Sequence, residues 1–184
     1  MQKIQMVSRF FHYLFIVILV AWVAAYFYRW FLMPVDLVIG QKPSPYLHFS
    51  LIPDGVKVLH PITYSTRFWG FLVSLIPLAV KLYIITSLIQ LFKLYEKGKI
   101  FTDKNVFHIK MIAYLLLAVQ LIRPVHEAFL TMILTWHNPV GHRMAVASMT
   151  GTNIGLMLTA LVILLVAWIM GEAKKLKEEQ ELTV

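Results

Sequence analysis

Four long apolar segments constrain the fold of this chain more than any other feature of its sequence. They lie near residues 10–33, 68–93, 106–135 and 151–171. Each is long enough to cross about 30 Å of hydrocarbon, which takes roughly 20 mostly apolar residues in a helix. Because backbone groups inside a bilayer must be hydrogen-bonded within the protein, we predict an all-α membrane protein, a four-transmembrane-helix bundle that forms a single domain over residues 1–184.

The composition excludes a soluble globular protein. Hydrophobic residues make up 59% of the chain and charged residues 14%, whereas soluble domains have about 25% charged residues. Seventeen Lys plus Arg against nine Asp plus Glu give a formal charge of +8, which in so apolar a chain indicates membrane topology, and we expect no direct nucleic-acid binding. The absence of cysteine excludes disulfides, thiolate catalysis, zinc–thiolate sites and iron–sulfur clusters.

The distribution of basic residues predicts the orientation, because Lys and Arg are retained on the cytoplasmic side. The basic residues at one set of helix ends are Lys3, Arg9, Lys93, Lys97, Lys99, Lys104, Lys110, Lys174, Lys175 and Lys177, and those at the other set are Lys42, Lys57, Arg67 and Arg143. The ratio of ten to four places both termini in the cytoplasm. Tryptophans prefer the membrane interface, and the indoles at predicted helix ends are Trp30, Trp69, Trp136 and Trp168.

The connections between the apolar segments differ in kind. In the extracytoplasmic loop 34–67, the runs YLHFSLI and VKVLH flank the turn tripeptide Pro53-Asp54-Gly55, which predicts a small β-hairpin that caps the bundle. In the turn LYEKGKIFTDKN, Gly98 is a predicted helix stop and Thr102 a predicted N-cap. The tail 172–184 is expected to extend the last helix as a solvated, charged segment.

Ionisable residues inside the predicted spans are the main candidates for a binding site. Lys81 lies midway along the second span, and Gln120, Arg123 and Glu127 share one face of the third, with His126 beside them. Intramembrane charges usually face a bundle interior or a water-filled cavity and often mark function. The cluster is therefore a ligand or ion site, or a structural group in which Arg123 and Glu127 pair while Lys81 reaches toward the interface.

Histidines and catalytic motifs give weaker signals. A haem could be held by His12 and His108, or a metal by His137 and His142, but no spacing forces either pair together. The sequence has no phosphate-cradling Gly-rich loop, GxSxG or HExxH motif. We therefore expect no catalytic residues, no cofactor and no metal site, and an enzyme using Glu127 or His126 for proton transfer is the least favoured class.

The turn GKIFTDKN and the end of the chain, LKEEQELTV, resemble the bacterial membrane family known as domain of unknown function 2975. The residues that carry the resemblance are Gly98, Phe101, Thr102, Asn105, Leu176, Glu179, Leu182 and Thr183. Val184 stands where isoleucine would be expected. The resemblance runs from the second predicted helix onward and implies a four-helix protein of the bacterial inner membrane, often encoded near a small helix-turn-helix regulator, without assigning a reaction.

These observations lead to two hypotheses of different classes. The first is a non-enzymatic sensor or regulatory protein that acts through a cytoplasmic partner such as a helix-turn-helix regulator. The residues of the tail that would contact this partner are Lys174, Lys175, Lys177, Glu178, Glu179 and Glu181. The alternative is a small carrier, or an accessory subunit of a membrane complex, that binds an ion or an anionic lipid at Lys81, Arg123 and Glu127. A homo-oligomer is compatible with both.

Overall fold

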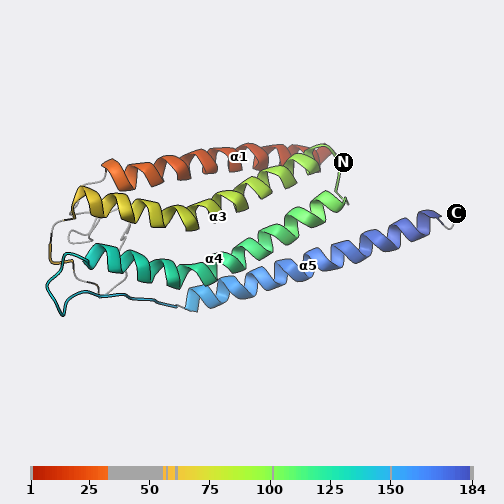
Figure 1. The fold of residues 1–184 in the computed structure, drawn as a ribbon. Helices are drawn as coiled ribbons and strands as arrows, with labels where there is room; N and C mark the ends of the chain where they lie inside the picture. Colours follow the sequence, from red (N-terminus) through yellow and green to blue (C-terminus); the bar gives the residue numbers. More distant parts are fainter. Residues whose placement is uncertain are drawn as a thin grey trace. The chain divides into compact units, whose positions relative to one another are not determined.

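The computed structural model describes residues 2–32, 56, 58–60, 62–100, 102–149 and 151–182 of the chain. Every regular element in these ranges is helical. The long helices (Figure 1) and the short π-helix that follows the first of them are α1 (Gln2–Phe27), η1 (Tyr28–Leu32), α3 (Tyr64–Glu96), α4 (Asp103–Thr135) and α5 (Gly151–Leu182).

The four long helices confirm the predicted apolar spans. Each contains a window that is long and apolar enough to cross a membrane, and the chain is therefore a multi-pass membrane protein. The first helix begins earlier than predicted, at Gln2 rather than near residue 10, whereas the continuation of α5 to Leu182 confirms that the tail extends the last helix. Both extensions contain charged as well as apolar residues, so hydropathy does not predict them as part of a membrane span. Neither contains a proline or glycine that would end the helix.

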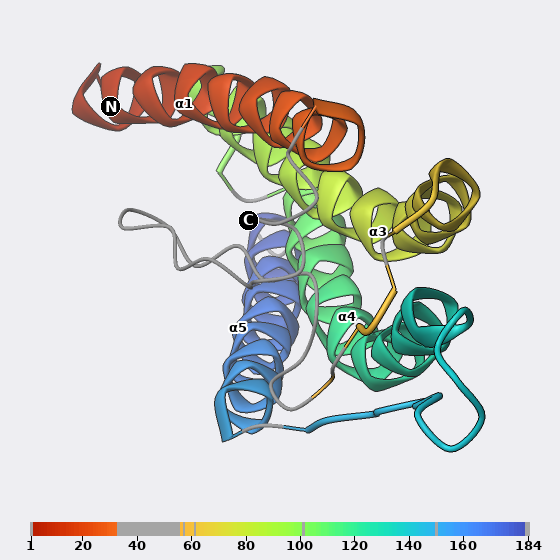
Figure 2. The ribbon, with the colours of Figure 1, turned by 90° about the vertical axis from the view of Figure 1, so that its left-hand side faces the viewer.

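The described chain forms two compact units, each of which takes parts of α1, α3 and α4. Unit 1 consists of Met1–Val20, Val80–Gln120 and Gly151–Val184. Its aromatic contacts join α1 to α3, where the ring centroids of Phe11 and Phe92 lie 5.2 Å apart. Two ion pairs add to these contacts, between Arg9 and Glu96 at 2.8 Å and between Lys174 of α5 and Asp103 of α4 at 2.5 Å. Figures 1 and 2 show α5 beside α4 in both views.

Unit 2 consists of Ala21–Ala79 and Leu121–Thr150. Its apolar core is built around Trp30 of η1, which is only 2% exposed and packs in one cluster with Val58, Leu130 and Leu134. The hydroxyl of Tyr26 donates a hydrogen bond to the Phe71 carbonyl oxygen at 2.7 Å. The Tyr26 bond connects α1 to α3, and the packing of Trp30 on Leu130 and Leu134 connects η1 to α4.

The burial of Trp30 differs from the interfacial position that we predicted. A Cβ at position 70 would overlap the six-membered ring of Trp30, so the indole packs directly against the backbone of Gly70. The other tryptophans at helix ends remain on the surface: Trp69, Trp136 and Trp168 are 57–58% exposed. The missing side chain of Gly70 on α3 therefore makes room for a large side chain from η1.

The predicted β-hairpin falls mostly on residues 46–55, which lie outside the described part of the chain. The described residues of its second run, Val56 and Val58–His60, form no strand. Instead, Val58 is buried in the core of unit 2 and the Leu59 amide donates a hydrogen bond to the Asn138 side chain at 3.0 Å. In this part of the loop, the apolar alternation therefore reflects packing on α4 and not a hairpin.

Candidate functional site

The ion pair predicted within α4 is present. Arg123 and Glu127 are separated by one helical turn, and Arg123 Nε donates to Glu127 Oε1 at 2.9 Å. The two side chains are unequally exposed, 43% for Arg123 and 13% for Glu127. The carboxylate is thus the more deeply placed partner, and an unpaired charge there would be costly.

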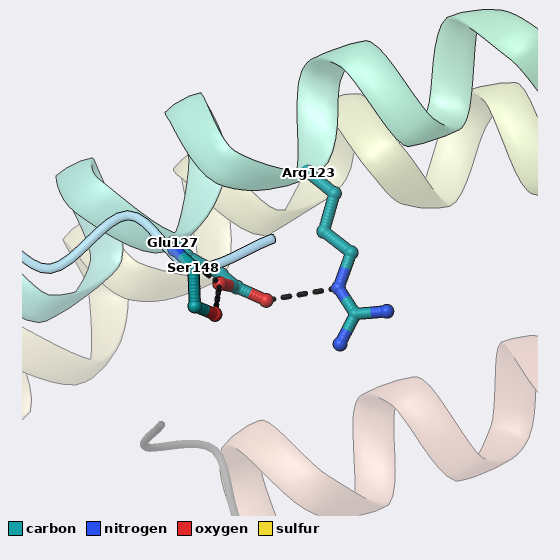
Figure 3. A network of polar contacts seen from close by, with 3 residues as sticks. All are labelled: Arg123, Glu127 and Ser148. Carbon is teal, nitrogen blue, oxygen red and sulfur yellow. Dashed lines mark hydrogen bonds and ion pairs between the residues drawn. The ribbon is translucent and has the colours of Figure 1, made fainter. Parts of the chain in front are cut away.

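A residue far along the chain completes the coordination of Glu127 (Figure 3). Ser148 lies in the extended segment between α4 and α5, and both its hydroxyl, at 2.5 Å, and its backbone N–H, at 3.3 Å, donate to Glu127 Oε2. The carboxylate therefore accepts three hydrogen bonds, one on Oε1 and two on Oε2. Hydrogen bonds to an ionised acceptor are the stronger ones, so this arrangement stabilises the charged form of Glu127 without a ligand.

Two threonines extend the same pattern along α4. Thr131 and Thr135 follow Glu127 at intervals of four residues, and both are fully buried. Thr131 Oγ1 accepts the Val146 N–H at 2.9 Å, and Thr135 Oγ1 accepts the Met144 N–H at 3.0 Å. Each hydroxyl also contacts the carbonyl four residues earlier in its own helix at 2.8 Å. Each hydroxyl thus donates to a carbonyl of α4, and that of Thr135 also lies 3.1 Å from the Met144 carbonyl. The hydroxyl oxygens accept backbone N–H groups of the extended segment.

We call this set of contacts, Glu127, Thr131 and Thr135 on α4 with Ser148, Val146 and Met144 on the segment, the polar ladder. Its regular spacing follows from geometry. Four residues of helix advance about 6.0 Å, and two residues of extended chain advance about 6.6 Å. Every second residue of segment 142–149 therefore meets every fourth residue of α4, in antiparallel order. Figure 1 shows the segment returning past α4 toward the start of α5.

Asn138 closes the end of the ladder. It is 1% exposed, accepts the Leu59 N–H and donates from Nδ2 to the His142 carbonyl, both at 3.0 Å. Arg143 Nε donates to the Asn138 carbonyl at 3.1 Å and its guanidinium lies 5.8 Å from the Trp136 ring centroid. The Asn138 side chain thus hydrogen-bonds the Leu59 N–H and the His142 carbonyl, two backbone groups that lie outside a helix and have no helical partner.

The five residues predicted as one cluster are divided between the two units. Arg123 and Glu127 pair directly in unit 2, and His126 Nε2 lies 3.1 Å from the Ser74 hydroxyl of α3 in the same unit. Lys81 and Gln120 belong to unit 1, where Lys81 is exposed and Gln120 is 3% exposed. The interpretation of Arg123 and Glu127 as a pair is confirmed, and one site made of all five residues stays a prediction.

The family described as protein of unknown function (DUF2975) matches residues 28–184. The chain belongs to this family. No curated protein and no solved structure matches it.

The turn that carries the DUF2975 resemblance has a defined cap at both helix ends. Gly98 has a φ of +73°, a conformation that favours glycine. Its N–H donates to the Tyr95 carbonyl, and the Lys99 N–H to the Leu94 carbonyl, both at 3.0 Å, which is the Schellman arrangement. The predicted helix stop is thus confirmed.

The second half of this DUF2975 turn is fixed by Thr102 and Asn105. Thr102 Oγ1 accepts the Asn105 N–H at 3.4 Å, which confirms the predicted N-cap. Asn105 is fully buried, and its Nδ2 donates to the carbonyls of Lys99 and Ile100 at 2.6 and 2.5 Å. Phe101, another of the residues that carry the resemblance, lies outside the described residues.

The DUF2975 tail is a helical continuation of α5. Lys174 binds Asp103 at 2.5 Å and Glu178 at 3.0 Å, and Lys175 binds Glu172 at 3.0 Å. These contacts lie within the chain. Glu179 and Leu176 are exposed, whereas the side chains of Lys177, Glu181 and Leu182 lie outside the described residues, as does Thr183.

The sequence did not identify Ser148 as a partner of the Glu127 carboxylate, nor Thr131 and Thr135 as acceptors of backbone N–H groups from the extended segment. One signal pointed to the threonines, which continue the four-residue spacing of Glu127 on one face of the helix. No group of three or more His, Cys, Asp or Glu side chains within the described ranges is arranged to hold a metal ion.

Proposed function

We propose that this DUF2975 protein is a non-enzymatic regulatory protein of the bacterial inner membrane that acts through a cytoplasmic partner bound to the end of α5. The observation that carries the proposal is the length of this helix. Lys174 contacts Asp103 at the start of α4, and α5 continues for eight more residues to Leu182. Eight helical residues add about 12 Å, so α5 ends in a projecting arm, residues 175–182.

The surface of the arm suits a protein partner. Leu176 is 60% exposed and stands between Lys175 and Lys177 in a stretch rich in charged residues. Exposed Glu179 lies three residues further and therefore on the same face. Helices dock into a partner's groove through apolar anchors at helical spacing, and Leu176 supplies one such anchor on the arm. The excess of basic residues at this end of the helices supports a cytoplasmic location, and a small helix-turn-helix regulator is the partner class that the family resemblance implies.

The contacts of Glu127 favour this function over proton transfer or transport. A carboxylate that accepts three hydrogen bonds from Arg123 and Ser148 is stabilised in one state, whereas a relay group must change its partners or its charge. His126 is likewise engaged with Ser74. We therefore infer that the Glu127 network holds the extended segment on α4.

A second candidate function is a carrier or accessory subunit that binds an anion. It is favoured by one observation: Arg123 remains 43% exposed although it pairs with Glu127. Exchange of Arg123 for methionine would then abolish ion flux into proteoliposomes that contain the purified protein. Under the regulatory proposal, the same exchange lowers stability and changes no flux.

The regulatory proposal is tested by photo-crosslinking in the native host. A photoreactive amino acid replaces Leu176 on the arm in one variant and Tyr64 in the control. Tyr64 is 92% exposed and lies at the opposite end of α3 from the turn. We expect the variant at position 176 to capture a soluble protein that the variant at position 64 does not capture.

A truncation sharpens this test. Removing residues 175–184 deletes the arm but keeps Lys174 and its contact with Asp103. The truncated protein is expected to remain in the membrane and to lose the captured partner. Capture of the same proteins from both positions, or capture at position 176 of this chain and lipid alone, would overturn the proposal.

A further inference from the structure

A basic hollow lies where α3 ends and α4 begins, within unit 1. It has a volume of about 200 Å³ and is open to the surface. The residues that line it are Gln90, Lys93, Leu94, Lys97, Lys104 and His108. None of these residues belongs to the polar ladder or to the arm, so neither the Glu127 network nor the regulatory proposal accounts for the hollow.

Helical spacing explains why these side chains converge. Residues 90, 93, 94 and 97 follow the i, i+3, i+4, i+7 pattern of a single face of α3. Lys104 and His108 are one turn apart at the start of α4. The Gly98 and Asn105 contacts described above hold the short turn between the helices, and the two faces therefore present their polar groups to the same space.

The charge of the hollow is one-sided. Three of its six residues are lysines, and no carboxylate lines it. The nearest acidic residues in sequence are engaged elsewhere, Glu96 with Arg9 and Asp103 with Lys174. In the described part of the chain, no ion pair involves Lys93, Lys97 or Lys104. Three ammonium groups thus share a concave site in which the described residues supply no counter-charge.

We propose that this hollow binds a phosphate group, as the headgroup of an anionic phospholipid or as a soluble phosphate. Lysine is a point charge suited to phosphate oxygens, and the Gln90 amide and His108 ring add hydrogen-bonding capacity. The volume limits the ligand, because pockets for drug-sized molecules measure about 300–1,000 Å³. A hollow of about 200 Å³ fits one phosphate group with its immediate substituent.

The place of the hollow favours the lipid source. Lys93 lies in the last turn of α3, and Lys104 lies in the first turn of α4, both at the ends of helices apolar enough to span a membrane. Lipid phosphates lie at this level, and basic pockets between transmembrane helices bind anionic headgroups.

The test measures binding of two probes to the full-length protein in neutral detergent. Native mass spectrometry follows phosphatidylglycerol, with zwitterionic phosphatidylcholine, which carries no net charge, as the comparison, and calorimetry follows inorganic phosphate. The pocket variant carries Lys93→Gln, Lys97→Gln and Lys104→Gln. The control variant carries Lys3→Gln, Lys99→Gln and Lys175→Gln, which removes the same charge from exposed positions outside the hollow.

We expect the pocket variant to lose about a hundredfold in affinity, since a lysine near a lipid surface contributes about fivefold, and the control variant to bind like the wild type. Preference for phosphatidylglycerol identifies a headgroup site, and binding of inorganic phosphate that the pocket variant loses identifies a soluble ligand. Absence of binding by the wild type, or equal affinities of the two variants, overturns the proposal. If the triple variant does not fold, Lys97→Gln and Lys99→Gln are compared singly, and about a fivefold difference is expected.

Discussion

The turn before α4 and the segment after it both contain backbone outside a helix, but they satisfy its polar groups in different ways. The turn is short, and its partners are local: Gly98 caps α3, and Asn105 reaches back five and six residues to two carbonyls. The segment after α4 is extended, and its amides bond to side chains 9 to 21 residues earlier in the chain. The turn is therefore stabilised by its own residues, and the segment is stabilised by side chains on one face of α4.

This difference separates the kinds of substitution that each connection tolerates. Breaking the turn requires a change in the turn itself, whereas the segment can be released by changes in α4 that leave the sequence of the segment intact. The following four substitutions test the comparison. Each is measured as the free energy of unfolding in mixed detergent micelles, followed by circular dichroism.

The largest effect is expected for Glu127→Ala. The substitution removes the acceptor of three hydrogen bonds and leaves Arg123 without its carboxylate. We expect a loss of roughly 3 kcal/mol, the lower end of the range for a broken buried pair, because Arg123 is 43% exposed. Glu172→Ala, which breaks the more exposed pair with Lys175, is the control and is expected to change stability by less than about 0.5 kcal/mol. Similar losses for both variants would contradict the role of Glu127.

Asn105→Ala is expected to have the next largest effect. The side chain is fully buried, and its loss leaves two carbonyl oxygens of the turn without the donor they share. About 2 kcal/mol should be lost, a cost typical of buried polar groups left unsatisfied. Hydrogen exchange should become faster in the turn and stay unchanged in residues 142–149. Equal acceleration in both connections would show that the turn is not held locally.

Thr131→Val tests the ladder without changing the shape of the side chain. The Val146 N–H loses its acceptor, and a loss of about 1.5 kcal/mol follows from the cost of one unpaired buried donor. Thr159→Val is a matched control, because among the described residues the Thr159 hydroxyl bonds only to the carbonyl four residues earlier in its own helix. If both valine variants are as stable as the wild type, the bond from Val146 contributes nothing measurable.

Gly98→Ala should have the smallest effect of the four. Alanine at a φ of +73° costs about 1 kcal/mol. Gly155→Ala lies in helix α5 with no atom within 4 Å of the new Cβ, so it should preserve or slightly increase stability. A stabilised Gly98→Ala variant would mean that the turn adopts another conformation in the membrane.

Much of the fold was predictable because its main signals are local. Hydropathy summed over about 20 residues finds a spanning helix without knowledge of its neighbours, and the caps at Gly98 and Thr102 depend on residues at most six positions apart. The Arg123–Glu127 pair was predictable for the same reason, since one helical turn separates the two residues.

The remaining features depend on residues that are distant in sequence. Ser148 is 21 residues from Glu127, and nothing in either local sequence states that they meet. The burial of Trp30 depends on the absence of a side chain at Gly70. A tryptophan at a helix end predicts an interfacial position only when no such space exists on a neighbouring helix.

The polar ladder has a consequence for how this protein can vary. At Met144 and Val146 the helix binds backbone N–H groups, so most side chains are acceptable there, although proline is not. The number of residues is more restricted, because one insertion would turn the alternate amides away from α4 and separate Ser148 from Glu127. Segment 142–149 therefore tolerates substitutions but not changes of length, and deletion of one residue would be more damaging than several substitutions.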